Sequence, residues 1–376
     1  MPKIYFDYNA TSPIHPEVIE LVSKVMAHTG NPSSMHSFGR EARRHVETGR
    51  GQLAELLGIR PNQVIFNSGA TEGNNTILNR YRGETIFISS IEHPSMLQTA
   101  QEITDKLHFI PCDSHGVIKL DSLRVMLQEH KPALVSIMYV NNESGVLQPI
   151  AEAAQTIKDF DADITVHSDI TQAIGRLPMD FNALGLDFAS LAAHKFGGPH
   201  GVGALIMKRG LQVPKLLHGG GQERRQRAGT ENVAGIAGMG LAAELCGADI
   251  ENYQTKMLKF REQIETAITK TSAHIRIFGQ QTDRAPNTIM FSMPNLQAET
   301  ILMNFDLEGV ALSSGSACSS GSLQASHVMH AMGDNEVHGA ASIRLSMGWA
   351  TTQEEVDQFI EIWQKVTLRF MDKLNS

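Results

Sequence analysis

Hydrophobic and polar positions form a regular block pattern between about residues 60 and 210. Short apolar runs, typical of strands buried on both faces, are separated by stretches whose apolar residues recur at helical spacing. The predicted strands are 63–67, 85–89, 107–111, 133–140, 164–169, 188–193 and 202–208. Strands that alternate with helices indicate a mostly parallel, seven-stranded sheet flanked by helices, so the predicted fold class is α/β.

The pattern changes after about residue 250, where a second set of elements begins. These are a charged amphipathic helix over 251–273, a strand at 288–293, a helix around 299–309, the segment SIRLSMG at 342–348 and a closing helix from Thr352. They are typical of a smaller α+β domain, with which we expect the first dozen residues to pack. A chain of 376 residues is too long for one core. We therefore predict a large domain over 15–250 and a small domain formed by 1–14 and 251–376.

Charge and composition argue against several classes of function. The net charge of −8 and a pI near 6.0 give no electrostatic case for binding nucleic acid. No apolar run reaches the ~20 residues of a membrane span, and the N-terminus has no apolar signal core. The three cysteines are typical of free thiols in a reducing compartment, and the 16 histidines show no metal-ligand spacing. We expect a cytoplasmic protein without a metal and without nucleic-acid or membrane partners.

Polar residues follow the first two predicted strands, at the sheet edge where ligands of such folds bind. Residues 68–71 form a tight turn that opens a helix, and the N–H groups there, including those of Ala70 and Thr71, could bind an anion. An ordinary helix cap explains the same residues. His93 precedes a proline that starts a helix; it is either structural or a planar ring or proton carrier of a site.

Three later strands end in groups with more specific chemistry. Asn142 lies in a dense polar cluster that could form a turn or contact a ligand. Asp169 ends a buried strand, which is costly unless a cation or hydrogen-bond donors meet it, although helix capping is an alternative. Gln172 lies one helical turn further on. Lys195 follows an apolar run and precedes a glycine-rich turn; a lysine held against an apolar wall becomes a nucleophile for carbonyl groups.

The order of these signals is more specific than any one of them. An anion turn, a planar residue, an acid for a ring nitrogen and a carbonyl-reactive lysine at successive strand ends are what pyridoxal 5'-phosphate (PLP) requires. The glycine- and arginine-rich segment 218–232, which contains Thr230, favours an anion-binding loop or a subunit contact over a plain basic surface. We therefore predict a PLP site.

One cysteine stands in an unusual setting. Cys318 lies in SSGSACSSGS (313–322), whereas a packing cysteine normally lies among apolar residues. We expect a mobile, solvated loop over about 313–325 that presents this thiol. Cys112 ends a predicted strand and Cys246 lies in an apolar helix, so we interpret both as packing residues.

At this point the chain resembles the cysteine desulfurases of the NifS/IscS type, a class V aminotransferase group among fold-type I PLP enzymes. The resemblance covers nearly the whole chain. Its motifs are YFDYNATSPIHPEV, NPSSMHSFGR, FNSGATEGNN, EHPSM, VNNESGVLQPI, HSDITQAIG, AAHKFGGPHG, GGGQERRQRAGTEN, SSGSACSSGS and SIRLSMG, in the family's order.

The resemblance implies a role for each candidate on the cofactor. Lys195 matches the lysine that binds PLP covalently, Asp169 the acid at the pyridine nitrogen, and Gln172 the amide at the phenolic oxygen. His93 matches the histidine that stacks on the ring and serves in acid–base steps. Ala70, Thr71 and His194 match residues that contact the phosphate. Thr230 matches a phosphate contact that the other subunit of a homodimer donates.

The resemblance also implies a substrate and an acceptor. Asn142 and Arg344 match the pair that holds the substrate's α-carboxylate, and Cys318 matches the nucleophile that accepts sulfur. The implied reaction converts L-cysteine to L-alanine and leaves a persulfide on Cys318. The serine-rich segment looks like that of the long-loop subgroup, which delivers sulfur to iron–sulfur scaffold proteins.

One departure and several alternatives stay open. Some relatives carry serine where this chain has Ala192, so a phosphate hydroxyl is missing or supplied elsewhere and PLP retention is expected to be slightly weaker. A selenocysteine lyase or a transaminase is the nearest alternative, and Cys318 argues against the transaminase. A PLP-free interaction platform and a nucleic-acid-binding protein that uses the arginines at 224–227 are further alternatives. The retained PLP residues argue against the first, and the acidic charge against the second.

Overall fold

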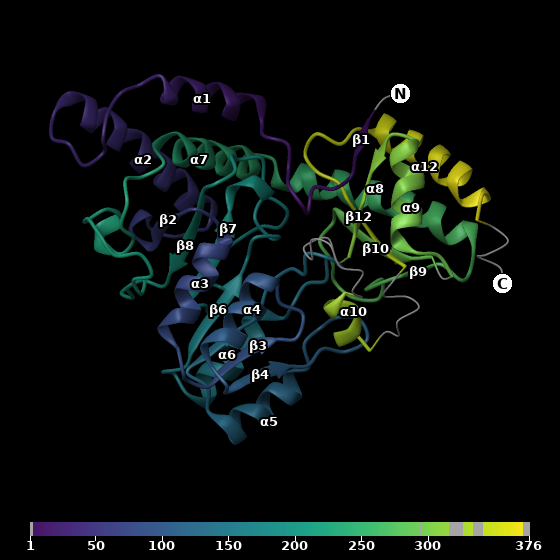
Figure 1. Ribbon diagram of the computed structural model, residues 1–376, viewed down its shortest axis with the longest axis horizontal. Helices are drawn as coiled ribbons and strands as arrows, with labels where there is room; N and C mark the ends of the chain where they lie inside the picture. The colour runs from purple at the N-terminus through teal and green to yellow at the C-terminus, as the bar shows by residue number, and fades with distance from the viewer. Residues whose placement is uncertain (1–2, 294, 316–325, 334–340, 371–376) are drawn as a thin grey trace.

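The computed structural model describes residues 3–293, 295–315, 326–333 and 341–370 (Figure 1). Its largest sheet has seven strands. In spatial order these are β2 (Val64–Asn67), β8 (Gly203–Met207), β7 (Phe188–Ala192), β6 (Thr165–Asp169), β5 (Leu134–Ser136), β3 (Ile86–Ser89) and β4 (Leu107–Ile110). All neighbours are parallel except β8, which runs antiparallel to β2 and β7. The predicted α/β class and its mostly parallel sheet are confirmed.

Side-chain alternation along the strands divides the surrounding helices into two layers. In β2, Val64 and Phe66 face one layer while Ile65 faces the other. The first layer contains α2 (Ser37–Leu56), α5 (Leu120–His130), α6 (Ile150–Phe160) and α7 (Val233–Ala248), and α1 (Pro16–Met26) packs on α7. The second contains α3 (Ala70–Arg80) and α4 (Pro94–Ile103). The sheet is therefore buried on both faces, which is why its strands read as continuous apolar runs.

A second sheet lies beside the first and carries its own core (Figure 1). Its strands, in spatial order, are β12 (Ser313–Ser314), β13 (Ser342–Ser346), β10 (Thr288–Ser292) and β9 (Arg276–Ile277), all antiparallel. The helices α8 (Ile250–Thr271), α9 (Ala298–Leu307) and α12 (Gln353–Leu368) cover one face. Ile343 and Leu345 point into that core, so Arg344 between them points to the opposite face.

The N-terminal segment joins the two sheets. Strand β1 (Ile4–Tyr5) pairs in parallel with β11 (Val310–Ala311), and Asp7 forms a bridge with Ser346 of β13. Further along, the backbone N–H of Ser12 donates to the carbonyl of His194 at the edge of the large sheet. The predicted domain boundaries stay a prediction, but this segment connects both regions directly.

The structure corrects the length of one predicted strand. The apolar run 133–140 forms a strand only over Leu134–Ser136. Ile137 and Tyr139 still donate to carbonyls of β6, but the chain no longer pairs with β3 on its other side. The run stays buried as it enters the polar cluster at Asn142, which explains its apolar sequence without a longer strand.

The length and apolar content of the helices bear on whether the chain could cross a membrane. Within the part of the chain that the structure describes, no single helix is long and apolar enough to span a bilayer. The bent pair α7–α8 reaches that length and composition only when its two arms, inclined by 72°, are taken together.

Candidate active site

The predicted site residues converge at the carboxyl ends of the parallel strands. A cleft of about 440 Å³ opens there, a volume within the usual range for small-molecule sites. The predicted residues that line it are Ala70, Thr71, His93, Asn142, Asp169, Gln172, His194, Lys195 and Arg344. Thr230 is exposed and is not among the lining residues, and Cys318 lies outside the described residues.

Lys195 is held by the N-terminal segment of the chain. It ends a single 3₁₀ turn that follows β7, and its Nζ donates to the carbonyl oxygens of Asn9 at 2.6 Å and Ala10 at 2.7 Å. The side chain is half-buried at the cleft wall. A lysine amine fixed at the edge of an enclosed cleft is the group that a carbonyl ligand requires.

Asp169 is the last residue of β6 and is 6% exposed. Its Oδ2 accepts from Nδ2 of Asn74 at 2.8 Å and its Oδ1 from the backbone N–H of Thr171 at 3.0 Å. Both of these donors are neutral, so neither of them supplies a cation to this buried carboxyl group. The hydroxyl of Thr171, which also lines the cleft, is buried without a hydrogen-bond partner. A protonated ring nitrogen would supply the missing positive charge.

His93 is linked to Asp169 through two side chains. Nδ2 of Asn74 also donates to Oγ of Ser95 at 2.9 Å, and this hydroxyl lies 2.9 Å from Nδ1 of His93. The backbone N–H of Ser95 donates to the same Nδ1, so the neutral ring carries its proton on Nε2. Burial lowers the pKa of His93, against the opposing pull of the Asp169 carboxylate. The imidazole is therefore neutral near pH 7 and able to accept a proton.

The anion end of the cleft is built from the start of α3 and two histidines. The first-turn N–H groups of Ala70 and Thr71 have no partner within the helix, as at every helix start. His194 and His200 line the same cleft and share a contact with Thr11, whose Oγ1 lies 3.2 Å from Nδ1 of His194 and 3.0 Å from Nε2 of His200. Burial and the neighbouring Lys195 charge lower the pKa of His194 to about 4, so it meets an anion as a neutral hydrogen-bonding ring.

Gln172 and Arg176 form a buried polar link beneath the cleft. Nε2 of Gln172 donates to the carbonyl of Asn9 at 3.0 Å, and its Oε1 accepts from the Arg176 guanidinium. Arg176 also donates to Oδ1 of Asn9 at 2.7 Å, and burial lowers its pKa to about 10. The amide expected at a cofactor oxygen is thus oriented by an arginine one helical turn away.

Arg344 crosses from the second sheet to the cleft. It is 2% exposed, its Nη2 donates to Oδ1 of Asp7 at 2.7 Å, and its Nη1 donates to the backbone carbonyl of Asn142 at 3.2 Å. Its Nε is buried without a hydrogen-bond partner. A buried guanidinium with unused donors at a cleft is suited to a carboxylate.

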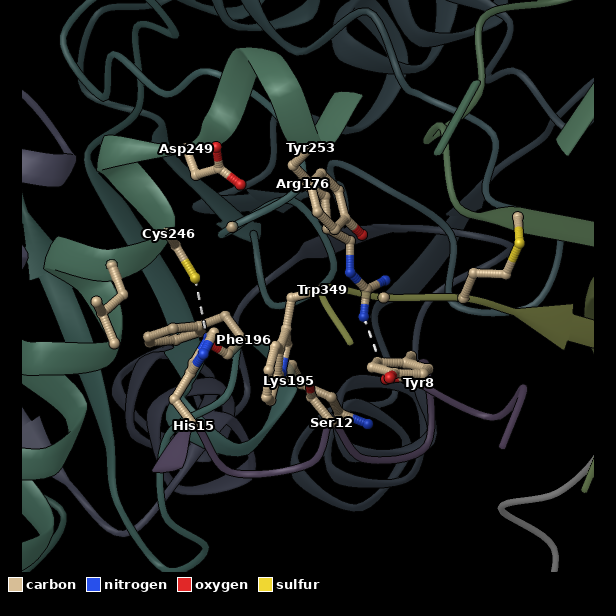
Figure 2. Close-up of a pocket in the computed structure, with 14 residues that line it drawn as sticks. Tyr8, Ser12, His15, Arg176, Lys195, Phe196, Cys246, Asp249, Tyr253 and Trp349 are labelled. Carbon is tan, nitrogen blue, oxygen red and sulfur yellow. Dashed lines mark hydrogen bonds between the residues drawn. The ribbon is translucent and has the colours of Figure 1, made fainter. Parts of the chain in front are cut away.

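Lys195 also borders a second, smaller cavity (Figure 2). The aromatic side chains of Tyr8, Phe196, Tyr253 and Trp349 form part of its walls. With about 60 Å³ it has no room for a cofactor, so the polar cleft on the other side is the candidate site. The thiol of Cys246 donates to the carbonyl of Phe196 at 3.2 Å, and burial raises its pKa to about 12, as suits the packing role that we predict.

The cleft contains a donor set that fits PLP. It offers an amine for the carbonyl carbon, a buried carboxylate for the ring nitrogen and helix N–H groups for the phosphate. A family model described as aminotransferase class-V matches residues 4–359. The chain belongs to this family. Enzymes of the family depend on PLP, so PLP is its cofactor.

Similar proteins carry more specific names. The cysteine desulfurase IscS of Dictyoglomus turgidum is 37% identical over 374 residues, which is 97% of this chain and 94% of that protein. The cysteine desulfurase IscS of Methanosarcina thermophila is 37% identical over 99% of this chain and 94% of its own. The crystal structure of a NifS-like protein from Rickettsia africae superimposes with a TM-score of 0.90, at 38% identity, over 97% of this chain and 99% of that one.

Four residues of the site were missed by the reasoning from sequence. Asn9 binds Lys195, Gln172 and Arg176, while Asn74 and Ser95 connect Asp169 to His93. Only Arg176 had a local signal, since it follows Gln172 at helical spacing. Asn74 lies one turn inside α3, where a polar residue is ordinary, and nothing near Asn9 in the sequence points to Lys195.

Proposed function

We propose that this chain is a PLP-dependent cysteine desulfurase, which takes sulfur from L-cysteine and releases L-alanine. The observation that carries the proposal is the convergence of Lys195, Asp169, His93 and Arg344 on one cleft, from two different sheets. Lys195 and Asp169 suit a pyridoxal cofactor. His93 suits a proton transfer, and Arg344 suits the binding of an amino-acid carboxylate. The cysteine desulfurase names of the full-length relatives support the same reaction.

Each residue then has a defined task. Lys195 holds the cofactor covalently, Asp169 pairs with its ring nitrogen, Gln172 meets its phenolic oxygen, and Ala70, Thr71 and His194 bind its phosphate. When bound, PLP withdraws electrons from the substrate's Cα and so makes the adjacent bonds labile. Arg344 and Asn142 orient the α-carboxylate, with Arg344 supplying the charge.

Proton movement falls to His93 and Lys195. His93 is neutral near pH 7 because burial lowers its pKa, so its one unprotonated ring nitrogen can take a proton from the substrate thiol or from Cα. The Ser95 contacts put that lone pair on Nδ1 and the N–H on Nε2, so Nε2 donates a hydrogen bond and accepts a proton only after the tautomer changes. The amine of Lys195 is the second group at this wall that could carry a proton.

Sulfur transfer follows at Cys318. Its thiolate attacks the substrate sulfur, an S–S bond forms, and the substrate's Cβ–S bond breaks. The electron pair of that bond stays on the carbon skeleton, which takes up protons and leaves as L-alanine. The protein keeps the sulfur as a persulfide, so the step balances without an external oxidant or reductant.

The persulfide requires an acceptor, and we propose an iron–sulfur scaffold or another sulfur-accepting protein in the cytoplasm. We also propose a homodimer in which Thr230 of one subunit reaches the phosphate bound by the other. In support, Thr230 is exposed and is not among the residues that line the cleft of its own chain. The exposed side chains of Met35 and Phe38 add apolar surface suited to burial at a subunit contact.

The test is the production of alanine and sulfide from L-cysteine, with a reductant, by wild type and by Cys318→Ala, both loaded with PLP. We expect wild type to be active and Cys318→Ala to lose roughly 100-fold or more in rate. Cys112→Ala is the matched control, because Cys112 is a buried packing residue, and it should retain activity.

Two outcomes would contradict the proposal. Equal alanine production by wild type and Cys318→Ala would show that Cys318 does not accept the sulfur. No reaction of the PLP-loaded wild type with L-cysteine would favour the lyase or transaminase alternatives, which can be assayed on the same samples with selenocysteine and with pairs of amino and keto acids.

A further inference from the structure

Glu143 is a buried carboxylic acid next in sequence to Asn142, which lines the cleft. Glu143 itself is 4% exposed. Its Oε2 accepts a hydrogen bond from Oγ of Ser326, which is 2% exposed. The same hydroxyl accepts from the backbone N–H groups of Val328 and Met329, so Ser326 starts the short helix α10 (His327–Ala331) while binding Glu143.

A second segment passes against the same carboxyl group. A Cβ atom on Gly315 would lie 2.9 Å from Oε2 of Glu143 and 3.0 Å from Oγ of Ser342. The first distance is shorter than real Cβ contacts and the second is tight, and the Met290 side chain is as close at 2.8 Å, so Gly315 passes close to the carboxylate in a crowded place where a larger residue would displace these side chains. The backbone N–H of Gly315 also donates to the carbonyl of Ser342 at 3.4 Å.

The positions of these two contacts in the chain are specific. Gly315 is the last described residue before 316–325, and Ser326 is the first one after it. Cys318 belongs to the intervening sequence. One carboxyl group thus contacts both chain ends that flank the sulfur-accepting cysteine in sequence.

The charges around Glu143 connect it to the substrate side of the cleft. Burial raises its pKa to about 7, against the Ser326 hydrogen bond and the Arg344 charge, which both lower it. Of the other titratable groups on neighbouring elements, Asp7 pairs with Arg344, and His327 of α10 hydrogen-bonds the carbonyl of Glu92 at 2.8 Å. Arg344 is therefore the charge that Glu143 responds to most directly.

We propose that Glu143 is a positioning residue for sulfur transfer: its carboxyl group holds Gly315 and Ser326 beside the wall that carries Arg344. The inference rests on the proposed desulfurase function and extends it. The hydrogen bonds described for Asp169 go to Asn74 and Thr171 and that of the Glu143 side chain to Ser326, so we expect the loss of Glu143 to leave cofactor binding in place. What it changes is the step that requires Cys318.

The experiment separates substrate binding from sulfur transfer in the PLP-loaded enzyme. L-Alanine has the carboxylate and amine of the substrate but no sulfur. The change in cofactor absorbance on titration with L-alanine therefore measures binding at Lys195 and Arg344 without any sulfur transfer. Single-turnover mixing with L-cysteine, followed by mass spectrometry of the Cys318 peptide, reports persulfide formation.

For Glu143→Ala we expect persulfide formation to slow roughly 10-fold or more, while L-alanine affinity and PLP content change less than about twofold. Ser326→Ala should show the same selective loss, and the double variant should be no worse than the single ones, because the two residues act as one unit. Glu143→Gln keeps an oxygen that accepts the Ser326 hydrogen bond. It should therefore retain most of the rate but lose the pH dependence that a group titrating near pH 7 contributes.

Glu308→Gln is the control, because it removes a partly buried carboxyl group whose ion pairs are to Lys365 and Arg369, and it should change neither readout. If Glu143→Ala does not fold, Ser326→Ala carries the same comparison. Wild-type rates of persulfide formation in these variants would overturn the inference, as would an equal loss of L-alanine binding. If wild type itself forms no persulfide on Cys318, the proposed function fails and this inference fails with it.

Discussion

The two walls of the cleft are built in different ways. The cofactor wall comes from successive strand ends of one sheet, where Asp169 and Lys195 follow β6 and β7 directly. The substrate wall is assembled from distant parts of the chain, since Arg344 of the second sheet binds Asp7, 337 positions away, and the carbonyl of Asn142. Local turns thus determine the cofactor wall, whereas the packing of one sheet beside the other determines the substrate wall. Substitutions on the two walls should therefore fail in different ways.

The largest expected effect is on the cofactor wall. Lys195→Ala removes the only described amine that lines the cleft, and we expect the rate of alanine formation to fall roughly 1,000-fold or more. The absorbance of the bound cofactor should change as well. Lys259→Ala, at an exposed position of α8, is the control and should match wild type. Activity of Lys195→Ala within tenfold of wild type would contradict the assignment.

Asp169→Asn probes the same wall more mildly. Asparagine keeps the shape but places an amide where a carboxylate faces Asn74 and, when PLP is bound, the ring nitrogen. We expect kcat to fall roughly 100-fold with weaker retention of PLP, while KM for L-cysteine changes little. Steady-state kinetics and cofactor content after dialysis measure both. A rise in KM alone would contradict this assignment, because it would mean that Asp169 acts in substrate binding.

Arg344→Lys probes the substrate wall and should mainly change KM, whereas Asp169→Asn should mainly change kcat. Lysine keeps the charge but cannot bind Asp7, the carbonyl of Asn142 and a substrate carboxylate in the same planar geometry. We expect KM for L-cysteine to rise about 10- to 100-fold, with PLP content unchanged. If PLP is lost in parallel, the two walls are not separable in the way that their construction indicates.

The smallest expected effect is on stability, and its sign differs between the walls. Burial lowers the pKa of His167 in β6 from 6.5 to about 4, so acidification from pH 6.5 to 4 protonates the unfolded chain first and destabilises the fold. Burial raises the pKa of Glu143 from 4.5 to about 7, so stability is instead lost as pH rises from 4.5 to 7. Each group changes the free energy of unfolding by at most about 3 kcal/mol over its pH range.

Urea unfolding between pH 4.5 and 8 separates these two contributions. Glu143→Gln should be stabilised relative to wild type as pH rises, and His167→Asn relative to wild type as pH falls. Lys259→Ala changes an exposed position of α8 and should parallel wild type. Parallel pH curves for all four proteins would contradict both pKa directions.

The fold and the cofactor wall could be predicted to a large extent. Apolar runs bounded by turn residues identify the seven strands, and the strand-end rule places Thr71, Asp169 and Lys195 at one edge. The run 133–140 was predicted too long, because burial without strand pairing gives the same apolar pattern. For Arg344, the family resemblance supplied a role that the local pattern of SIRLSMG alone did not indicate.

The partners of these residues could not be predicted. The amide of Asn74 between Asp169 and Ser95, and the carbonyls of Asn9 and Ala10 on Lys195, are contacts between segments with no sequence pattern in common. A hydrogen bond of this kind depends on where two elements meet, and the propensities of single residues cannot predict that.

By itself, the sequence determined which chemical groups this protein has and the strand ends at which most of them stand, because hydrophobic periodicity is a local property of the chain. The tertiary structure decided how those groups are charged and held. Only burial against distant segments makes His93 neutral, raises the pKa of Glu143 and brings Arg344 to Asn142. Desolvation and long-range contact exist only once the two sheets have packed, and that is the physical reason for the division.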